Sequence, residues 1–253
     1  MSPPEVEKLT HARRIPAQRM WASVNPLDAL SANPLTAALK CVAREGLFRA
    51  IKVVVSTAVD TSFDLRYGTD TLRRVEMNAL NFESQHKEHA TFYQATQAGP
   101  LRKIIRKLDL PKDGVFVDLG SGKGRVLLIA AQCGFEKIVG VEFSAELCDI
   151  ARENVKVFRR KTHVTSRIDV VESDVANYPI ERDQRVFFMY NPFDELVMNR
   201  LLANLRGSVR QFPRKIWLIY NTPKYGEVIG NSGLFRACQE LEISGSLLSV
   251  YNT

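Results

Sequence analysis

The sequence is poor in the residues that bind metals or form disulfides, with four cysteines and four histidines among 253 residues. No two cysteines have the C-x-x-C spacing of zinc and redox motifs. Only His86 and His89 form a close pair, and their polar surroundings favour a solvated helix face over a metal site. We therefore expect no metal site, and buried or part-buried thiols in a reduced cytoplasmic protein. The cysteines are Cys41, Cys133, Cys148 and Cys238.

The sequence also lacks a long apolar run. Its best candidate for a membrane span, residues 50–59, is short and interrupted by Lys52, whereas a spanning helix needs about 20 apolar residues. The first residues include Glu5 and Glu7 and form no continuous hydrophobic segment, which argues against a secretory signal. These features predict a cytoplasmic location without a transmembrane segment.

The overall composition is that of a globular protein with a sizeable core, since 45% of the residues are hydrophobic and 25% are charged. Disorder, collagen and a disulfide-rich miniprotein are thereby excluded. The net charge of +7 raises the prospect of an anionic partner. However, residues 1–112 hold 17 Lys and Arg against 11 Asp and Glu, whereas residues 113–253 hold 18 against 17. Any anionic partner would thus be met by the N-terminal part of the chain.

Residues 1–99 are expected to form a helical N-terminal extension. Five of the eleven prolines lie in residues 1–34, which predicts an irregular or mobile arm. Apolar residues recur at helical spacing over 47–58, which predicts an amphipathic helix that packs on the domain or, as the alternative, lies on a membrane surface. Residues 61–71 are expected to be a loop, followed by a helix over about 72–80.

From about residue 100 the pattern changes to alternating helices and strands. An apolar stripe over 101–108 predicts a helix whose basic residues cover the solvated opposite face. Strands separated by helices predict an α/β domain over 100–253 with a doubly wound, mostly parallel sheet and a terminal antiparallel hairpin. Helices are expected at 125–133, 145–159 and 194–206, and strands at 115–119, 138–143, 168–171, 186–190, 216–220, 241–243 and 247–251.

A glycine-rich loop, Gly120-Ser121-Gly122-Lys123-Gly124-Arg125, follows the first strand. A dinucleotide fingerprint would need a small residue at 125, and a phosphate-binding loop would need glycine at 117 and serine or threonine at 124. The chain has Arg125, Val117 and Gly124 at these positions, so neither motif fits. An acidic residue followed by G-x-G-x-G suits S-adenosyl-L-methionine (SAM), because a carboxylate such as Asp118 attracts its ammonium and sulfonium groups. A tight turn without a ligand is the alternative.

Two further carboxylates follow later strands. Glu142 ends the second strand, 18 residues after Gly124, where an acidic side chain can accept hydrogen bonds from both ribose hydroxyls. Asp174 follows the third strand, where it could accept a hydrogen bond from the adenine amino group. Taken singly, Glu142 could be a solvated strand end and Asp174 a loop or helix-cap residue. Together with Asp118 they form a set at the strand ends where open α/β sheets bind ligands.

These motifs resemble those of the class I, seven-stranded SAM-dependent methyltransferases. Residues 116–125, Phe-Val-Asp-Leu-Gly-Ser-Gly-Lys-Gly-Arg, resemble the first motif of that family. Residues 139–144 resemble the second motif and residues 172–175 the adenine motif. The resemblance implies a seven-stranded Rossmann-like fold and the cofactor SAM. The cofactor-binding residues that it implies are Asp118, Gly120, Ser121, Gly122, Gly124, Glu142, Phe143, Asp174 and Val175.

A closer resemblance is to a group of bacterial methyltransferases with Phe-Asp-x-x-Tyr/Phe-Gly-x-Asp-Thr upstream and Tyr-Asn-Pro-Phe after the fourth strand. Here these segments are residues 63–71 and 190–193, and residues 219–223 also fit. This resemblance implies no substrate. It makes Tyr67, Thr69, Asp70, Thr71 and Tyr93 candidates for a lid over the cofactor, with ordinary loop or packing roles as the alternative.

Asn191-Pro192-Phe193 is the candidate catalytic segment. It is similar to the Asn/Asp-Pro-Pro-Tyr/Phe motif of methyltransferases that act on amino nitrogen. That resemblance implies that Asn191 accepts a hydrogen bond from the target amine, that Pro192 stiffens the turn, and that Phe193 packs against the substrate. The chain departs from the motif because Asp194 replaces its last residue and only one proline is present. A plain turn from strand to helix is the alternative.

The sequence therefore predicts a SAM-dependent methyltransferase that acts on an amine of a protein lysine or a small molecule. O-methylation of a small molecule is one alternative, and a non-catalytic module that binds SAM or nucleic acid is another. Nucleic acid is the less favoured partner, because the chain has no cluster of aromatic and basic residues typical of single-strand binding. A nicotinamide-dependent oxidoreductase is disfavoured by Arg125.

Overall fold

The fold is described from a computed structural model that covers residues 58, 60–73, 95–190, 193–243 and 246–253. Val55–Thr253 forms one compact unit. Several predictions fall outside the described residues. They are the expected arm over 1–34, nearly all of the helix expected over 47–58, residues 74–80 of the next expected helix and the His86–His89 pair. Cys41, Tyr93, Asn191 and Pro192 also lie outside the described residues. The boundary expected between residues 99 and 100 stays a prediction.

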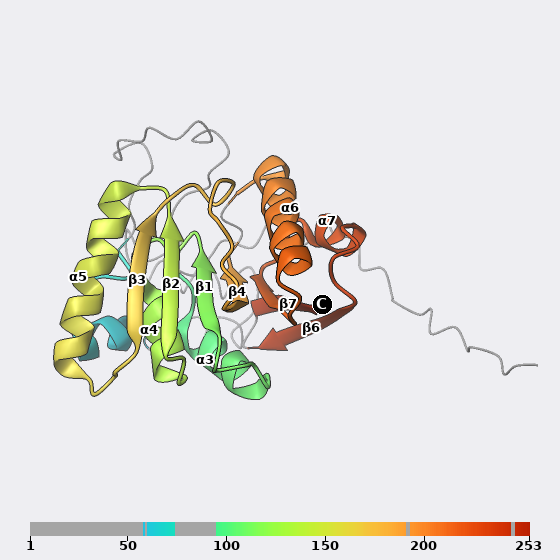
Figure 1. Cartoon of the computed structure of the whole chain (residues 1–253). Coiled ribbons are helices and arrows are strands. Elements are labelled where there is room, and N and C mark those ends of the chain that lie inside the picture. Colours follow the sequence, from blue (N-terminus) through green and yellow to red (C-terminus); the bar gives the residue numbers. More distant parts are fainter. Residues whose placement is uncertain (1–57, 59, 74–94, 191–192, 244–245) are drawn as a thin grey trace, which may run out of the picture. The chain divides into compact units, whose positions relative to one another are not determined.

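The unit is built on a seven-stranded sheet in the order β3-β2-β1-β4-β5-β7-β6 (Figure 1). The first five strands pair in parallel, whereas β7 pairs antiparallel to both β5 and β6. This is the predicted doubly wound sheet with its antiparallel hairpin. The strands are β1 Val115–Leu119, β2 Lys137–Glu142, β3 Arg167–Glu172, β4 Gln184–Met189, β5 Trp217–Asn221, β6 Ala237–Ile243 and β7 Ser246–Asn252.

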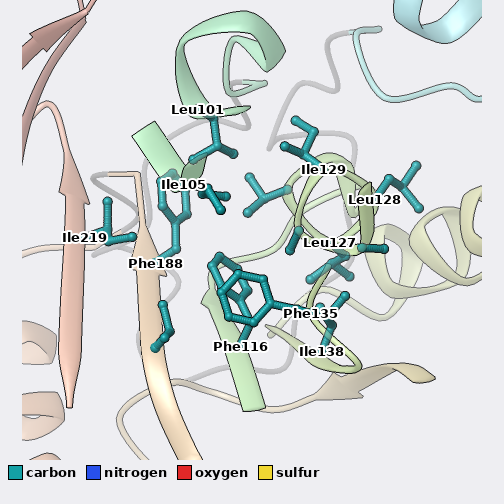
Figure 2. Packing of buried hydrophobic residues seen from close by; sticks show 14 of the residues in the cluster. Leu101, Ile105, Phe116, Leu127, Leu128, Ile129, Phe135, Ile138, Phe188 and Ile219 are labelled. Atoms are coloured by element: carbon teal, nitrogen blue, oxygen red, sulfur yellow. The ribbon is translucent and has the colours of Figure 1, made fainter. Parts of the chain in front are cut away.

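Helices pack on both faces of the sheet, and the strands alternate between two apolar clusters. In β1, Phe116 joins the cluster with α3, α4 and α5, whereas Val117 joins the cluster with α6. Figure 2 shows Phe116 packed with Phe135 among apolar side chains of α3 and α4. Every residue of β1 is buried, as expected for a central parallel strand. The helices are α3 Ala98–Lys107, α4 Arg125–Gln132, α5 Ala145–Lys161, α6 Glu195–Gln211 and α7 Gly226–Asn231.

Local sequence signals set where two of these helices begin. The Ser144 hydroxyl accepts a hydrogen bond from the Leu147 amide and caps α5. The Asp194 carboxylate accepts from the amides of Leu196 and Val197 and caps α6. The sequence departs from the amine-methyltransferase motif at Asp194, and the structure shows that this residue caps a helix.

The expectation of a loop over 61–71 was wrong for its first part, because residues 60–67 are helical. Phe63 and Tyr67 are one helical turn apart and their rings lie 4.9 Å apart, with Tyr67 a further 5.0 Å from Phe158 of α5. Gly68, with φ of 69°, ends the helix, and the amides of Gly68 and Thr69 both donate to the Asp64 carbonyl. An aromatic pair at i, i+4 was the overlooked helix signal.

The other elements from residue 98 onward overlap their predicted ranges, apart from the short α7, which was not predicted. β6 begins four residues earlier than expected, and α6 extends five residues further. Residues 72–73, expected to begin a helix, form a bend. Cys238 is exposed, so the expectation of buried or part-buried cysteines was wrong there; Cys148 is buried and Cys133 partly buried. In the described part of the chain, no helix has the length and apolar character needed to cross a membrane.

Candidate functional site

The candidate site lies where the sheet changes its direction of progression. From β1 the chain moves outward to β2 and β3, then returns to the other side of β1 to form β4 and β5. In such sheets a crevice forms at the carboxyl ends of the strands beside this switch point. Leu119 and Glu142 end β1 and β2, and Asn221 ends β5. The predicted residues therefore come from neighbouring strand ends at one edge of the sheet.

The glycine loop is held against β2 by its own backbone. The amides of Gly120 and Ser121 both donate to the Val141 carbonyl, at 2.8 and 3.0 Å. The Gly124 amide then closes a turn on the Ser121 carbonyl at 2.9 Å. Gly120, Gly122 and Gly124 all have positive φ, which explains the alternation of glycines in the loop.

Glu142 is buried and binds the loop from the neighbouring strand, so the alternative of a solvated strand end was wrong. Its Oε2 accepts a hydrogen bond from the Gly122 amide at 2.8 Å, and its Oε1 accepts from the Ser144 amide at 3.0 Å. A carboxylate has about four acceptor positions, so these amide donors leave capacity for ribose hydroxyls. Burial raises the pKa of Glu142, and the amide donors Ser144, Gly122 and Phe143 oppose that rise.

Asp118 and Ser121 supply polar atoms that the described residues do not satisfy. Asp118 Oδ2 and Ser121 Oγ are both buried, and neither has a hydrogen-bond partner within the described part of the chain. An unsatisfied buried polar atom costs about 1–3 kcal/mol, so its presence at a strand end points to a missing ligand. Burial raises the pKa of Asp118 well above its ordinary value, and the nearby charge of Glu142 raises it further.

Asp174 is half-buried and lies two residues beyond β3. Its Oδ1 accepts a hydrogen bond from the Ala176 amide at 2.8 Å, which stabilises the turn that follows the strand. Phe143, directly after β2, is also half-buried, and Val175 is buried in the cluster with α6. The turn-stabilising role is therefore present, and the binding roles of Asp174, Phe143 and Val175 stay predictions.

Of the candidate catalytic segment, the structure describes only Phe193. This residue is buried in the cluster with α6, directly before the cap of that helix. Its predicted contact with a substrate stays a prediction, as do the roles of Asn191 and Pro192. Across the same sheet edge, Asn221 of β5 helps to line a hollow together with Thr96, Gln97, Pro100, Leu101 and Leu248.

Thr222, the next residue, has φ of 53°. This conformation is rare for a β-branched residue and costs about 1–3 kcal/mol. Strain of this kind is concentrated at functional sites, which makes the end of β5 a candidate for the acceptor side. In the sequence, residues 219–223 stand out only through their resemblance to the bacterial methyltransferase group.

The comparisons with known proteins bear on this site. Residues 73–172 match the family model described as "Histone methylation protein DOT1", and this range includes β1, the glycine loop, β2 and Glu142. A "Protein-lysine N-methyltransferase" of Saccharolobus islandicus (strain REY15A) is 27% identical over 120 residues, which are 47% of this chain and 72% of the relative. The chain is a SAM-dependent methyltransferase.

Solved structures agree with the fold of this methyltransferase. A protein from Nostoc punctiforme PCC 73102, named as an O-methyltransferase, superimposes with a TM-score of 0.50 at 16% identity, covering 62% of this chain and 56% of that one. A SAM-dependent methyltransferase from Aquifex aeolicus gives a TM-score of 0.48 at 17% identity, covering 60% and 88%. At 16% identity the likeness to the Nostoc protein concerns the fold alone, which is that of the class I methyltransferases.

The residues of this methyltransferase fit SAM as its cofactor. The unsatisfied Asp118 Oδ2 suits an ammonium donor, and the remaining acceptor capacity of Glu142 suits a diol. When bound, SAM supplies an electrophilic methyl group on a sulfonium. The assignment of each contact to one residue remains a prediction.

We expect SAM binding to be coupled to proton release. Because the pKa of Asp118 is raised, the free protein keeps a proton there up to a higher pH, and this proton must leave when an ammonium binds. SAM affinity should therefore rise with pH through the raised pKa. The stability of the free protein should change in the opposite sense, because a carboxyl with a raised pKa stabilises the fold at low pH and loses this contribution as pH rises through that pKa.

Calorimetry in two buffers of different ionisation enthalpy measures this coupling directly. The apparent binding enthalpy should differ between the buffers in proportion to the protons released. Asp118→Asn should remove the difference, and Asp149→Asn, an exposed carboxylate on α5, should leave it unchanged. Equal enthalpies for the wild type in both buffers would contradict the expectation.

Proposed function

We propose that this methyltransferase transfers a methyl group to an amine nitrogen, with a lysine side chain of a protein as the acceptor. The observation that carries the proposal is the match of residues 73–172 to the histone-methylation family model. The relative named as a protein-lysine N-methyltransferase supports the same acceptor class. The resemblance of residues 190–193 to the motif of amine methyltransferases adds independent support from the other half of the sheet.

The chemistry of this proposal is an in-line displacement, in which the amine lone pair attacks the methyl carbon. The reaction needs a neutral amine and a well-directed lone pair, so positioning supplies much of the rate. We assign Asn191 to accept a hydrogen bond from the amine, Pro192 to fix the turn, and Phe193 to pack beside the acceptor. Asp118 would hold the ammonium group of the cofactor, and Glu142 would hold its ribose.

Labelled methyl transfer into a lysate of the source cells tests the acceptor class. The purified enzyme is incubated with isotopically labelled SAM, and proteins and metabolites are analysed separately by mass spectrometry. The proposal expects label on lysine side chains of one or a few proteins. Label confined to hydroxyl groups of metabolites would overturn it in favour of O-methylation, and label in nucleic acid would overturn it in favour of the nucleic-acid alternative.

Asn191→Ala should lower kcat about 100-fold and change the dissociation constant of SAM less than about twofold. The reason is that the variant loses the orientation of the acceptor, and misplacement by about 1 Å can cost about two orders of magnitude in rate. Steady-state kinetics on the identified acceptor and calorimetry with SAM measure the two quantities. Asn199→Ala, on the exposed side of α6, is the matched control and should alter neither. Equal losses of turnover and SAM affinity would remove the special role of Asn191.

A further inference from the structure

The two cations of the glycine loop, Lys123 and Arg125, are both buried. Lys123 is 1% exposed and Arg125 is 2% exposed. Both side chains bind the upstream segment 60–73, which is more than 50 residues away in the sequence. In Figure 1 this segment lies beside α4 and α5. Lys123, which makes the loop resemble a phosphate-binding motif, thus has a partner within its own chain.

Arg125 binds both the first turn of the helix at 60–67 and the segment that follows this helix. Its guanidinium donates to Asp60 Oδ1 at 2.8 Å and to Thr71 Oγ1 at 2.7 Å, and it lies 4.7 Å above the Phe63 ring. Asp64, one turn after Asp60, organises the end of the segment by accepting from the Thr71 amide and from the Thr69 and Thr71 hydroxyls. These hydrogen bonds hold the segment in one conformation against the glycine loop.

Asp70 touches the loop directly. Its Oδ2 lies 3.1 Å from the Lys123 ammonium. Its backbone amide donates to Asn154 Oδ1 at 2.8 Å, and its carbonyl accepts from Asn154 Nδ2 at 3.1 Å. The same Nδ2 donates to the Lys123 carbonyl at 3.0 Å. The side chain and the main chain of Lys123 are thereby both tied to Asp70, the second through the buried amide of Asn154.

Gly122, the neighbour of Lys123 in the loop, contacts a residue that is assigned to the cofactor. Gly122 precedes Lys123 and donates its amide to Glu142, the carboxylate assigned to the ribose. Two adjacent residues of the loop are thus held from two sides, Gly122 by Glu142 and Lys123 by Asp70. Gly122 and Lys123 share one planar peptide unit. A movement of Lys123 would therefore rotate this unit and displace Gly122.

We propose that Asp70 is a positioning residue for SAM, which acts through Lys123 and Asn154 to hold the glycine loop in its binding conformation. Asp70, a candidate lid residue, thus acts on the loop and needs no contact of its own with the cofactor. The proposal rests on SAM binding at this loop and on no assumption about the acceptor.

Charge reversal at Asp70 tests the proposal. Asp70→Lys places a second cation beside the buried Lys123 ammonium and should weaken SAM binding about tenfold, which corresponds to about 1.4 kcal/mol. Asp70→Glu keeps the charge and should recover most of the affinity. Glu153→Lys is the matched control, because Glu153 forms an exposed ion pair with Lys156 beside Asn154 and undergoes the same change of charge. It should leave the affinity within about twofold.

A double variant separates positioning from a general loss of stability. In the Lys123→Met background, Asp70→Lys should have little further effect on SAM affinity, because its repulsion acts through Lys123. Calorimetry reports the dissociation constant, and urea denaturation reports the folded fraction of each variant. Reversible unfolding raises the apparent dissociation constant only in inverse proportion to that fraction, so a variant that is folded without ligand shows the effect of positioning alone. An unchanged dissociation constant in Asp70→Lys, or additive effects of the two substitutions, would overturn the proposal. Failure of the wild type to bind SAM would instead overturn the cofactor assignment.

Discussion

Replacing Gly122 by arginine should weaken SAM binding at least about 100-fold, which corresponds to about 2.7 kcal/mol. Gly122 has φ of 51°, and its amide donates to Glu142 at 2.8 Å. A residue with a side chain is strained by about 1–2 kcal/mol in this conformation, so arginine would disturb the loop and its contact with Glu142. The arginine would also add a cation beside the site of a cofactor that is itself positively charged. Titration calorimetry measures the loss.

Gly134→Arg is the matched control for this variant. Gly134 also has positive φ, of 88°, but it lies at the other end of α4, and no atom lies within 4 Å of a Cβ added there. The same arginine should cost stability through backbone strain and leave SAM affinity within about twofold. If Gly122→Arg bound SAM as tightly as the control, the cofactor site would have to lie elsewhere.

Replacing Arg125 by methionine should lower the free energy of unfolding by about 3–5 kcal/mol at neutral pH, which is the usual effect of removing one partner of a buried ion pair. The substitution leaves the Asp60 carboxylate, itself 2% exposed, without its 2.8 Å partner. Burial already raises the pKa of Asp60 although Arg125 opposes this rise. Urea denaturation monitored by circular dichroism measures the change.

The pH dependence and a second substitution make this prediction specific. Without Arg125 the pKa of Asp60 should rise further, so the destabilisation should shrink as pH falls through that raised pKa, because the protonated carboxyl needs no counter-charge. Asp60→Asn in the same chain should recover part of the loss at neutral pH, since its amide oxygen can still accept from the Ala98 amide. Arg167→Met breaks an exposed ion pair and should cost less than about 1 kcal/mol. Equal losses for the two arginines would show that Arg125 carries no buried charge pair.

Much of the fold was predictable because its signals are local. β1 was placed at its observed bounds, since a short run of four apolar residues and Asp118, followed by glycines, specifies a strand. The helix over 60–67 was missed because its sequence is polar apart from Phe63, Leu65 and Tyr67, and its stability comes from Phe158 and Arg125. These contacts join residues far apart in the sequence, and periodicity carries no information about them.

In the candidate site, too, the local features were predictable and the contacts between distant residues were not. Asp118, Glu142 and the glycines could be placed at strand ends from their spacing alone. The partners of Lys123 and Arg125 could not, because the loop motif gives no indication of which distant segment faces it. The spacing of Asp60 and Asp64 at i, i+4 was the available signal for a cationic partner. Two carboxylates on one helix face repel each other unless a cation or solvent lies beside them.

The burial of Arg125 and Lys123 also determines how far the chain can be shortened. A fragment that began at residue 100 would keep every strand of the sheet but lose Asp60, Asp64 and Asp70 together. Two cations would then remain in the interior without these counter-charges, and the aromatic surface of Phe158 would lose Tyr67. The smallest autonomous folding unit should therefore start before residue 60.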